Sequence, residues 1–232
     1  MIQTDKITFS TLDGVFIKGD WQIPKGAKTC ALLLHMMPAT KESFEPLSEK
    51  LFESGIASLA IDLRGHGESL AKKSGDEKSG KLIELNYKEF SDEQHQAGRL
   101  DVDAALNFIK EKGFDEDKIV MVGASIGANL TLDAMSRYSR IARGVLLSPG
   151  LDYRGVKTEA AAKVLEQGQK VWAVAAEGDV YSAQTCETLA KMKAENISSK
   201  IFGGSDHGTN LFNSQPELTA DIVKFLITNV SW

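Results

Sequence analysis

A serine between two glycines stands where a strand is expected to pass into a helix. Residues 123–127 read Gly-Ala-Ser-Ile-Gly, which places Ser125 in a Gly-x-Ser-x-Gly motif. A continuously apolar run at 119–122 precedes the motif, and helical spacing follows from 126 to about 138. Small residues around such a serine let the strand and the helix approach each other across a sharp, strained turn. We therefore predict that Ser125 is an activated nucleophile, beside a helix N-terminus that favours negative charge.

A serine hydroxyl is a poor nucleophile unless a base removes its proton, and four histidines are candidates for that base. His35 and His66 precede the serine, in tight turns after predicted strands. His95 lies near the start of a predicted helix and is expected at the surface. His207 lies in a glycine-flanked loop after the last predicted strand, from where it can reach over Ser125. His207 is therefore the predicted base.

A catalytic histidine needs a carboxylate that fixes its tautomer and stabilises the imidazolium. Asp179 comes just past the predicted strand at 171–175, where it can meet a histidine from the neighbouring loop. The competing carboxylates are Asp152 after the preceding strand, Glu177, and Asp206, which adjoins the predicted base so that the two side chains would diverge. The non-catalytic alternative for Asp179 is a helix N-cap or a turn.

Apolar strand-like runs alternate with helical spacing along most of the chain. The start differs, because residues 6–11 and 15–23 alternate in polarity around an Asp-Gly turn, which predicts an antiparallel hairpin. The later alternation predicts an α/β fold, with a mostly parallel central sheet and helices on both faces. Ligands bind beyond the carboxyl ends of the strands in such sheets. The three candidate residues all follow predicted strands and are expected at this edge.

Two segments interrupt the regular alternation. Residues 70–90 are polar and are expected to form an exposed excursion at the rim of the site. Residues 148–170 hold Tyr153 and one short amphipathic helix at about 159–167, and we expect this segment to form a small cap. A small cap favours an open site for small or medium substrates, with Tyr153 either lining the pocket or packing beside it. Otherwise residues 1–232 are predicted to form one domain.

The order Ser125, Asp179, His207 resembles the α/β-hydrolase superfamily, whose triads run nucleophile, acid, histidine along the chain. Two further stretches are similar to motifs of that family. Residues 32–38, Leu-Leu-Leu-His-Met-Met-Pro, resemble its strand that ends in His-Gly-x, and residues 62–69, Asp-Leu-Arg-Gly-His-Gly-Glu-Ser, resemble its Asp-x-Arg-Gly-x-Gly-x-Ser stretch. The resemblance covers nearly the whole chain and implies the α/β-hydrolase fold of the small-cap esterases, lipases and acyl hydrolases.

The resemblance also implies an oxyanion hole made of two backbone N–H groups. One belongs to Ile126, directly after the nucleophile. The other lies in the turn after the apolar strand, where the family pattern carries onto His35-Met36-Met37 and makes Met37 the expected donor. The chain departs from the family here, because Met36 stands where glycine is common, so the choice between Met36 and Met37 stays open.

These features together predict a serine hydrolase, most simply a carboxylic ester hydrolase that forms an acyl-enzyme on Ser125 with small or medium acyl esters. The same triad also serves thioester, peptide or amide hydrolysis and perhydrolysis, and a catalytically silent, ligand-binding member of the fold is an alternative of another class. No cofactor or metal is expected. The histidines lack a ligand spacing such as His-x-x-x-His, and the glycines lack a nucleotide-binding pattern.

Composition narrows the partners. The formal net charge of −5 argues against an electrostatic grip on nucleic acid or an anionic membrane, so a small-molecule ester is the expected partner. No apolar run approaches the roughly 18 residues of a membrane span, and residues 1–6 lack the character of a secretory signal, so we expect a cytoplasmic protein. Cys30 and Cys186 are expected to be buried thiols rather than a disulfide framework, and the oligomeric state stays open.

Overall fold

The computed structural model describes residues 2–74 and 80–227, and its centre is a sheet in the strand order β12-β11-β8-β7-β3-β4-β2-β5-β6, with β1 paired to β2. The strands are β1 (Asp5–Ser10), β2 (Val15–Gln22), β3 (Cys30–Leu34), β4 (Ala57–Ile61), β5 (Ala71–Lys73), β6 (Leu82–Glu84), β7 (Ile119–Ala124), β8 (Arg143–Leu147), β11 (Lys170–Ala176) and β12 (Ile197–Phe202). The helices are α1 (Glu45–Glu53), α2 (Asp92–Gln96), α3 (Gly98–Glu111), α4 (Ile126–Arg137), α5 (Glu159–Lys163), α6 (Val180–Met192), α7 (Leu211–Ser214) and α8 (Leu218–Ile227).

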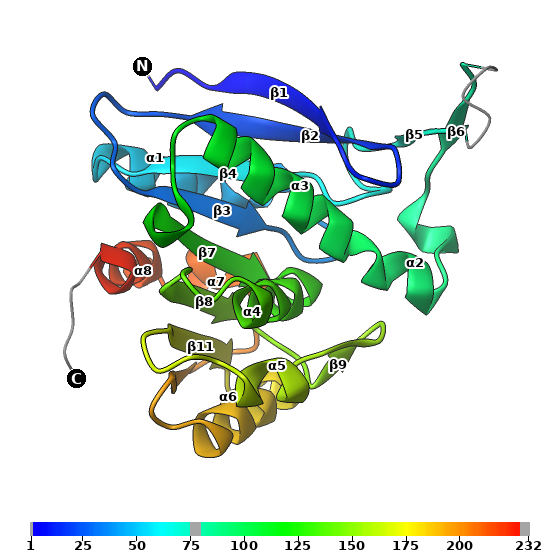
Figure 1. Cartoon of the computed structure of the whole chain (residues 1–232). Coiled ribbons are helices and arrows are strands. Elements are labelled where there is room, and N and C mark those ends of the chain that lie inside the picture. The colour runs from blue at the N-terminus through cyan, green and yellow to red at the C-terminus, as the bar shows by residue number, and fades with distance from the viewer. Residues whose placement is uncertain (1, 75–79, 228–232) are drawn as a thin grey trace.

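Six neighbouring strands, from β12 to β4 in the sheet order, pair in parallel, whereas β1 and β2 form an antiparallel hairpin. The predicted mostly parallel sheet with an N-terminal hairpin is therefore confirmed (Figure 1). The carboxyl ends of β7, β8, β11 and β12 lie at one edge of this sheet because the strands run in the same direction. The residues that follow them thus share that edge.

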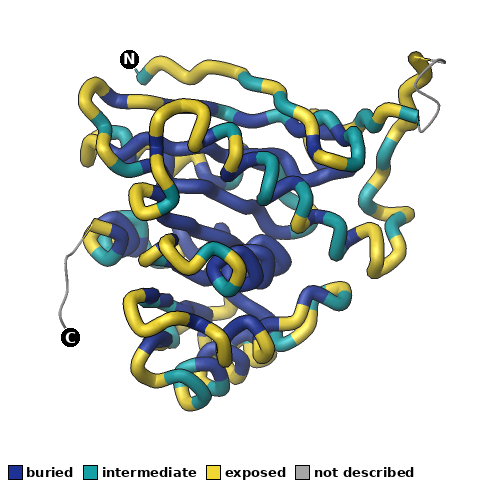
Figure 2. The backbone as a smooth tube through the Cα atoms, viewed as in Figure 1, coloured by how far each residue is buried: buried dark blue, intermediate teal, exposed yellow. Residues whose placement is uncertain are grey.

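The core has two layers, one on each face of the sheet. In β3, which is fully buried, Leu32 and Leu34 pack in the layer that α3, α4 and α6 cover, and Leu33 packs in the layer that α1 and α8 cover. Figure 1 shows α3 and α4 crossing one face, and Figure 2 shows the central strands buried beneath the exposed outer turns. A strand covered on both faces must be apolar throughout, which is why these segments lack alternation.

The segment 70–90 is exposed as predicted, but it is not an unpaired excursion. β5 pairs antiparallel with β2, with Val15 opposite Lys72, and β6 continues the sheet beyond it. Every residue of β6 is exposed, and the hairpin extends away from the body of the molecule (Figure 1). Strands of three residues are too short to show a period in the sequence, so pairing with β2 decides their conformation. Residues 75–79 lie outside the described ranges.

The segment 148–170 folds as a small hairpin, β9 (Asp152–Tyr153) with β10 (Val156–Lys157), followed by α5. The helix α5 is shorter than the predicted 159–167. Asn129 of α4 fastens the segment, because its Nδ2 donates to the carbonyl of Val156 at 2.7 Å and its Oδ1 accepts from the N–H of Gly150 at 3.1 Å. The hairpin is thereby fixed to the helix that follows Ser125.

Two smaller expectations concern membranes and thiols. Across the described ranges, no helix has the length and apolar character that crossing a membrane requires. Cys30 and Cys186 are both buried and free, as predicted.

Candidate active site

Ser125 occupies a strained turn between β7 and α4. Its backbone has φ 53° and ψ −118°, in a region that residues other than glycine rarely adopt, and its side chain is largely buried. The N–H of Ser125 donates to the carbonyl of Leu147 at 2.8 Å, which holds the turn against β8. The strand, sharp turn and helix predicted around Ser125 are all present.

The two glycines of the motif are required by close packing. A Cβ on Gly123 would overlap the carbonyl of Gly127, and a Cβ on Gly127 would overlap the carbonyl of Leu34 and lie 2.7 Å from that of His35. Backbone atoms cannot yield to such contacts. The end of β3 therefore lies directly against the start of α4, which brings the turn after β3 close to Ser125.

The structure brings His207 and Asp179 together. Nδ1 of His207 lies 2.7 Å from Oδ2 of Asp179, and the histidine side chain is about one-third exposed whereas the carboxylate is mostly buried. Asp179 stands at the N-cap of α6, yet its side chain makes no capping hydrogen bond. The competing Asp152 accepts a hydrogen bond from the N–H of Gly155 within the β9–β10 turn. Of the competing carboxylates, Asp179 is therefore the one that contacts the His207 ring.

Three contacts place the loop that carries His207. The N–H of Gly208 donates to Oγ of Ser148 at 2.9 Å; Ser148 is fully buried directly after β8, at φ 52°. A Cβ on Gly208 would lie 2.5 Å from Sδ of Met36 and 3.4 Å from Cβ of Ala124. The histidine loop therefore packs against both the residue before Ser125 and the turn after β3. Ser148 belongs to no sequence motif, so the sequence alone does not indicate that it helps to place the loop of His207.

The turn after β3 is oriented by the imidazole of His35. Its Nδ1 donates to the carbonyl of Met36 at 2.8 Å, and its Nε2 accepts from the N–H of Leu63 at 3.0 Å. In a trans peptide the C=O and the following N–H point in opposite directions, so the N–H of Met37 is directed away from His35. Within residues 2–74 and 80–227, no acceptor takes the N–H of Met36, Met37 or Ile126.

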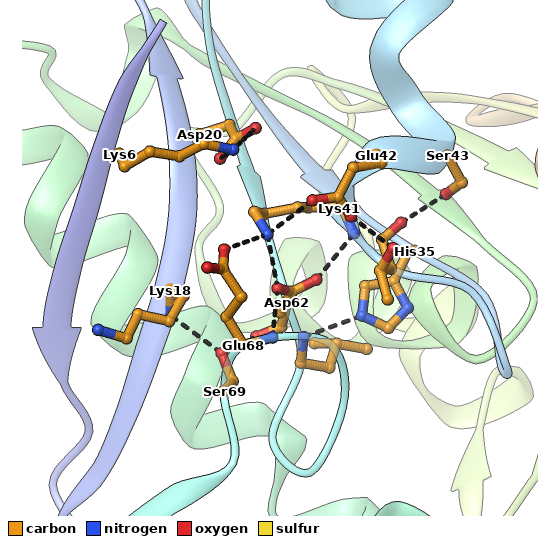
Figure 3. Close-up of polar contacts among 12 residues, drawn as sticks. Lys6, Lys18, Asp20, His35, Lys41, Glu42, Ser43, Asp62, Glu68 and Ser69 are labelled. Carbon is orange, nitrogen blue, oxygen red and sulfur yellow. Dashed lines mark hydrogen bonds and ion pairs between the residues drawn. The ribbon is translucent and has the colours of Figure 1, made fainter.

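A buried lysine fastens the same turn to the segment after β4 (Figure 3). The backbone N–H of Lys41 donates to Oδ1 of Asp62 at 2.9 Å, and its Nζ reaches Oδ2 of Asp62 at 2.8 Å and Oε2 of Glu68 at 2.7 Å. The side chains of Lys41 and Asp62 are almost fully buried. Burial lowers the pKa of Lys41, but hydrogen bonds to Asp62, Glu42 and Glu68 outweigh it, so the pKa is raised and the amine stays charged. Lys41 belongs to no sequence motif. The signal that could have pointed to it is Asp62, because a carboxylate directly after a buried strand needs a charged partner.

The other motif residues brace these loops. Arg64 forms ion pairs with Asp13 at 3.0 Å and with Asp101 at 2.7 Å. The His66 ring stacks on Tyr87 at 3.9 Å. Burial, followed by the nearby His35, lowers the pKa of His66 to about 4, so its ring is neutral at pH 7.

The expectation that His95 lies at the surface was wrong. Its side chain is buried and packs edge-on against Phe90, with 5.5 Å between the ring centroids. The short helix α2 begins after a capping box at Ser91, which turns His95 inward. Sequence spacing could not show this rotation, because the preceding segment carries no regular pattern.

Comparison with known proteins decides the family. A family model described as serine aminopeptidase, S33, matches residues 26–196. The chain belongs to this family of α/β-hydrolases. This family member is 30% identical to a polyketide transferase of a Penicillium species, grgF, over 153 residues. The match covers 64% of this chain and 46% of the transferase, so the chain spans about half the length of that relative.

Solved structures of esterases share the fold. An esterase of Pyrococcus furiosus superposes with a TM-score of 0.76 at 17% identity, over 97% of this chain and 90% of the esterase. A thermostable carboxyl esterase of Bacillus coagulans superposes with a TM-score of 0.75 at 11% identity, over 97% of this chain and 98% of the other. At such identities the likeness concerns the fold alone, and the predicted α/β-hydrolase fold is confirmed.

Proposed function

We propose that the protein is a carboxylic ester hydrolase that works through an acyl-enzyme on Ser125. The observation that carries the proposal is the hydrogen bond between His207 and Asp179, made by a loop that packs against the strained turn of Ser125. Nucleophilic acyl transfer requires a serine on such a turn and an imidazole that a carboxylate orients toward it.

Acylation follows from the hydrogen-bond pattern. Nδ1–H of His207 donates to Asp179, which leaves Nε2 as the proton acceptor. As Oγ of Ser125 attacks the ester carbonyl, its proton passes to Nε2, and Asp179 stabilises the imidazolium that forms. The imidazolium then protonates the leaving alkoxide. Water attacks the acyl-enzyme by the reverse sequence and releases the acid.

The oxyanion of each tetrahedral intermediate needs hydrogen-bond donors. The N–H of Ile126 begins α4, and the N–H of Met37 points away from His35; both lack an acceptor among the described residues. We assign these two groups as the oxyanion donors, because the Met36 carbonyl is held by His35 and orients the next N–H. Loss of one such donor typically costs about 3–4 kcal/mol of transition-state stabilisation.

We assign segment 148–170 as the small cap of a single catalytic domain. It consists of one two-stranded hairpin and one short helix, and Asn129 fastens it to α4. A cap of this size favours an open site. Small or medium acyl esters are therefore the proposed substrates.

The decisive variant is Ser125→Ala. It should abolish hydrolysis of p-nitrophenyl esters and labelling by a fluorophosphonate, with an unchanged unfolding midpoint. The matched control is Ser205→Ala, which removes an exposed hydroxyl from the histidine loop and should behave as wild type. Ester turnover retained by Ser125→Ala would contradict the proposal.

The same triad also serves thioester hydrolysis, amide hydrolysis and acyl transfer to an alcohol. A panel of p-nitrophenyl esters of increasing chain length, acyl thioesters and aminoacyl amides should show the highest kcat/KM on short or medium esters. Turnover in the presence of an added alcohol tests the transfer chemistry that the name of the Penicillium relative suggests. Faster cleavage of aminoacyl amides or thioesters than of esters would reassign the substrate while keeping the triad.

A further inference from the structure

Tyr153 projects from the β9–β10 hairpin into the catalytic residues. Its Oη lies 3.1 Å from Oγ of Ser182, a fully buried hydroxyl in the first turn of α6. Its ring stands edge-on to His207, with 6.3 Å between the ring centroids and 88° between the planes. A phenol that meets the predicted base from the cap side is within the reach of the reacting groups.

The phenol of Tyr153 also interacts with the side chain of Ser125, the proposed nucleophile. Burial, together with the charge of Asp179, raises the pKa of Tyr153, against hydrogen bonds to the hydroxyls of Ser182 and Ser125. The phenol therefore keeps its proton at neutral pH and is a neutral donor beside Ser125.

The ring has little freedom to leave this position. A Cβ on Gly150 would lie 2.7 Å from the Tyr153 ring and 2.8 Å from that of Tyr181, so the two rings press against the start of the cap. Tyr153 and Tyr181 pack edge-to-face, with centroids 5.7 Å apart. Tyr181 is itself fastened, since its hydroxyl accepts from the N–H of Asp152 at 3.0 Å. Packing thus aims the Tyr153 hydroxyl.

Only one arrangement of protons serves this group of hydroxyls and the proposed base together. In the proposed mechanism the hydroxyl of Ser125 donates to Nε2 of His207, which has a lone pair. Oγ of Ser125 then has lone pairs to accept from Tyr153, whose oxygen in turn accepts from Ser182. Each hydroxyl donates once, and the chain ends on the imidazole.

Resting on the hydrolase function proposed above, we propose that Tyr153 is a catalytic residue that donates a hydrogen bond to Oγ of Ser125. When the Oγ–H bond breaks and the proton moves to Nε2 of His207, an electron pair on Oγ forms the bond to the acyl carbon. Tyr153 keeps its own proton throughout and stabilises the negative charge that develops on Oγ. Ser182 holds the phenol in the orientation that directs its proton to Oγ.

Tyr153→Phe tests this role, because it removes the hydroxyl and keeps the ring. Hydrogen bonds to developing charge are among the stronger ones, so kcat/KM should fall about 10- to 100-fold, mostly in kcat. The rate of labelling by a fluorophosphonate should fall by a similar factor, and the unfolding midpoint should stay near that of wild type. Ser182→Ala should cause a smaller loss of the same kind.

The matched control is Tyr138→Phe, whose hydroxyl donates to Asp103 at the opposite end of α4 from Ser125, and it should keep near wild-type kcat/KM. Because Tyr153 acts on the nucleophile, its loss should be equal for p-nitrophenyl and alkyl esters. Wild-type turnover by Tyr153→Phe, or a loss that grows with the basicity of the leaving alcohol, would overturn the proposal. Ester turnover by Ser125→Ala would instead contradict the proposed hydrolase function. Failure of the Tyr153 role and failure of the hydrolase function are therefore distinguishable.

Discussion

The two turns that flank the candidate site are held in place by different means. The turn of Ser125 is determined by main-chain packing, since Gly123 and Gly127 admit the neighbouring backbone where any side chain would overlap it. The turn after β3 is held by side chains, through the imidazole of His35 and the buried pair of Lys41 with Asp62. The turn of the candidate nucleophile is thus encoded in five consecutive residues, whereas the turn that carries the proposed donor Met37 depends on groups that lie far away along the chain.

The largest effect should come from Gly127→Ala, which tests whether main-chain packing determines the turn of Ser125. Its Cβ would overlap the carbonyl of Leu34, so β3 and α4 must separate, and neither backbone can relax cheaply. We expect little folded protein and no ester turnover, measured by circular dichroism and with p-nitrophenyl esters. Gly168→Ala, where an added Cβ meets nothing within 4 Å, should fold normally. A folded, active Gly127→Ala would show that this close approach is dispensable.

Lys41→Met tests the side-chain route to the turn after β3. It leaves the carboxylate of Asp62 buried without its cation, which typically costs about 3–5 kcal/mol of unfolding free energy. Urea unfolding measures the loss, and kcat should fall because the turn that carries Met37 loosens. Lys50→Met breaks an exposed pair with Glu53 and should change stability by less than about 1 kcal/mol. Equal effects of the two substitutions would refute the distinction.

His35→Gln tests, through the pH dependence of the unfolding free energy, how the imidazole of His35 holds the turn after β3. Burial lowers the pKa of His35 below its ordinary value of 6.5, against hydrogen bonding to Met36 and the charges of Asp62 and Glu42, while the charge of Lys41 lowers it further. The unfolded chain then binds more protons, so this contribution to stability is complete above about pH 6.5 and is lost as the pH falls toward the folded pKa.

Glutamine can replace both hydrogen bonds of His35 without titrating. The unfolding free energy of His35→Gln should therefore fall less steeply than that of wild type between pH 7.5 and pH 5, measured by urea titration at each pH. The pKa of Asp101, which burial raises to about 6, acts in the opposite direction in both proteins and cancels in the difference. Parallel curves for the two proteins would exclude His35 as a titrating contributor.

The smallest expected effect is that of Ser148→Ala. It removes the acceptor of the Gly208 N–H beside His207, and an unmatched buried donor costs about 1–3 kcal/mol at most. Because the loop also packs on Met36 and Ala124, we expect about 1 kcal/mol of destabilisation and a fall in kcat of a few-fold. A variant with alanine that matches wild type would show that packing alone holds the loop.

The sequence was sufficient wherever the determinant is local. Continuous apolar runs predict the parallel strands because both faces of each strand are covered, and the Asp-Gly turn predicts the first hairpin. The motif around Ser125 predicts its strained turn for the same reason, since the steric demand lies within five residues. The candidate partners Asp179 and His207 could be named because the carboxyl ends of parallel strands share one edge.

Tertiary contacts decided the rest. β5 and β6 are strands because β2 offers an edge, and His95 is buried because α2 turns it inward. Lys41 meets Asp62 across 21 residues of sequence, and Tyr153 meets Ser182 across 29. No local pattern records such pairings, because each depends on two segments that only the folded sheet brings together. The sequence by itself therefore determined where the candidate nucleophile stands, and the tertiary structure decided which side chains surround it.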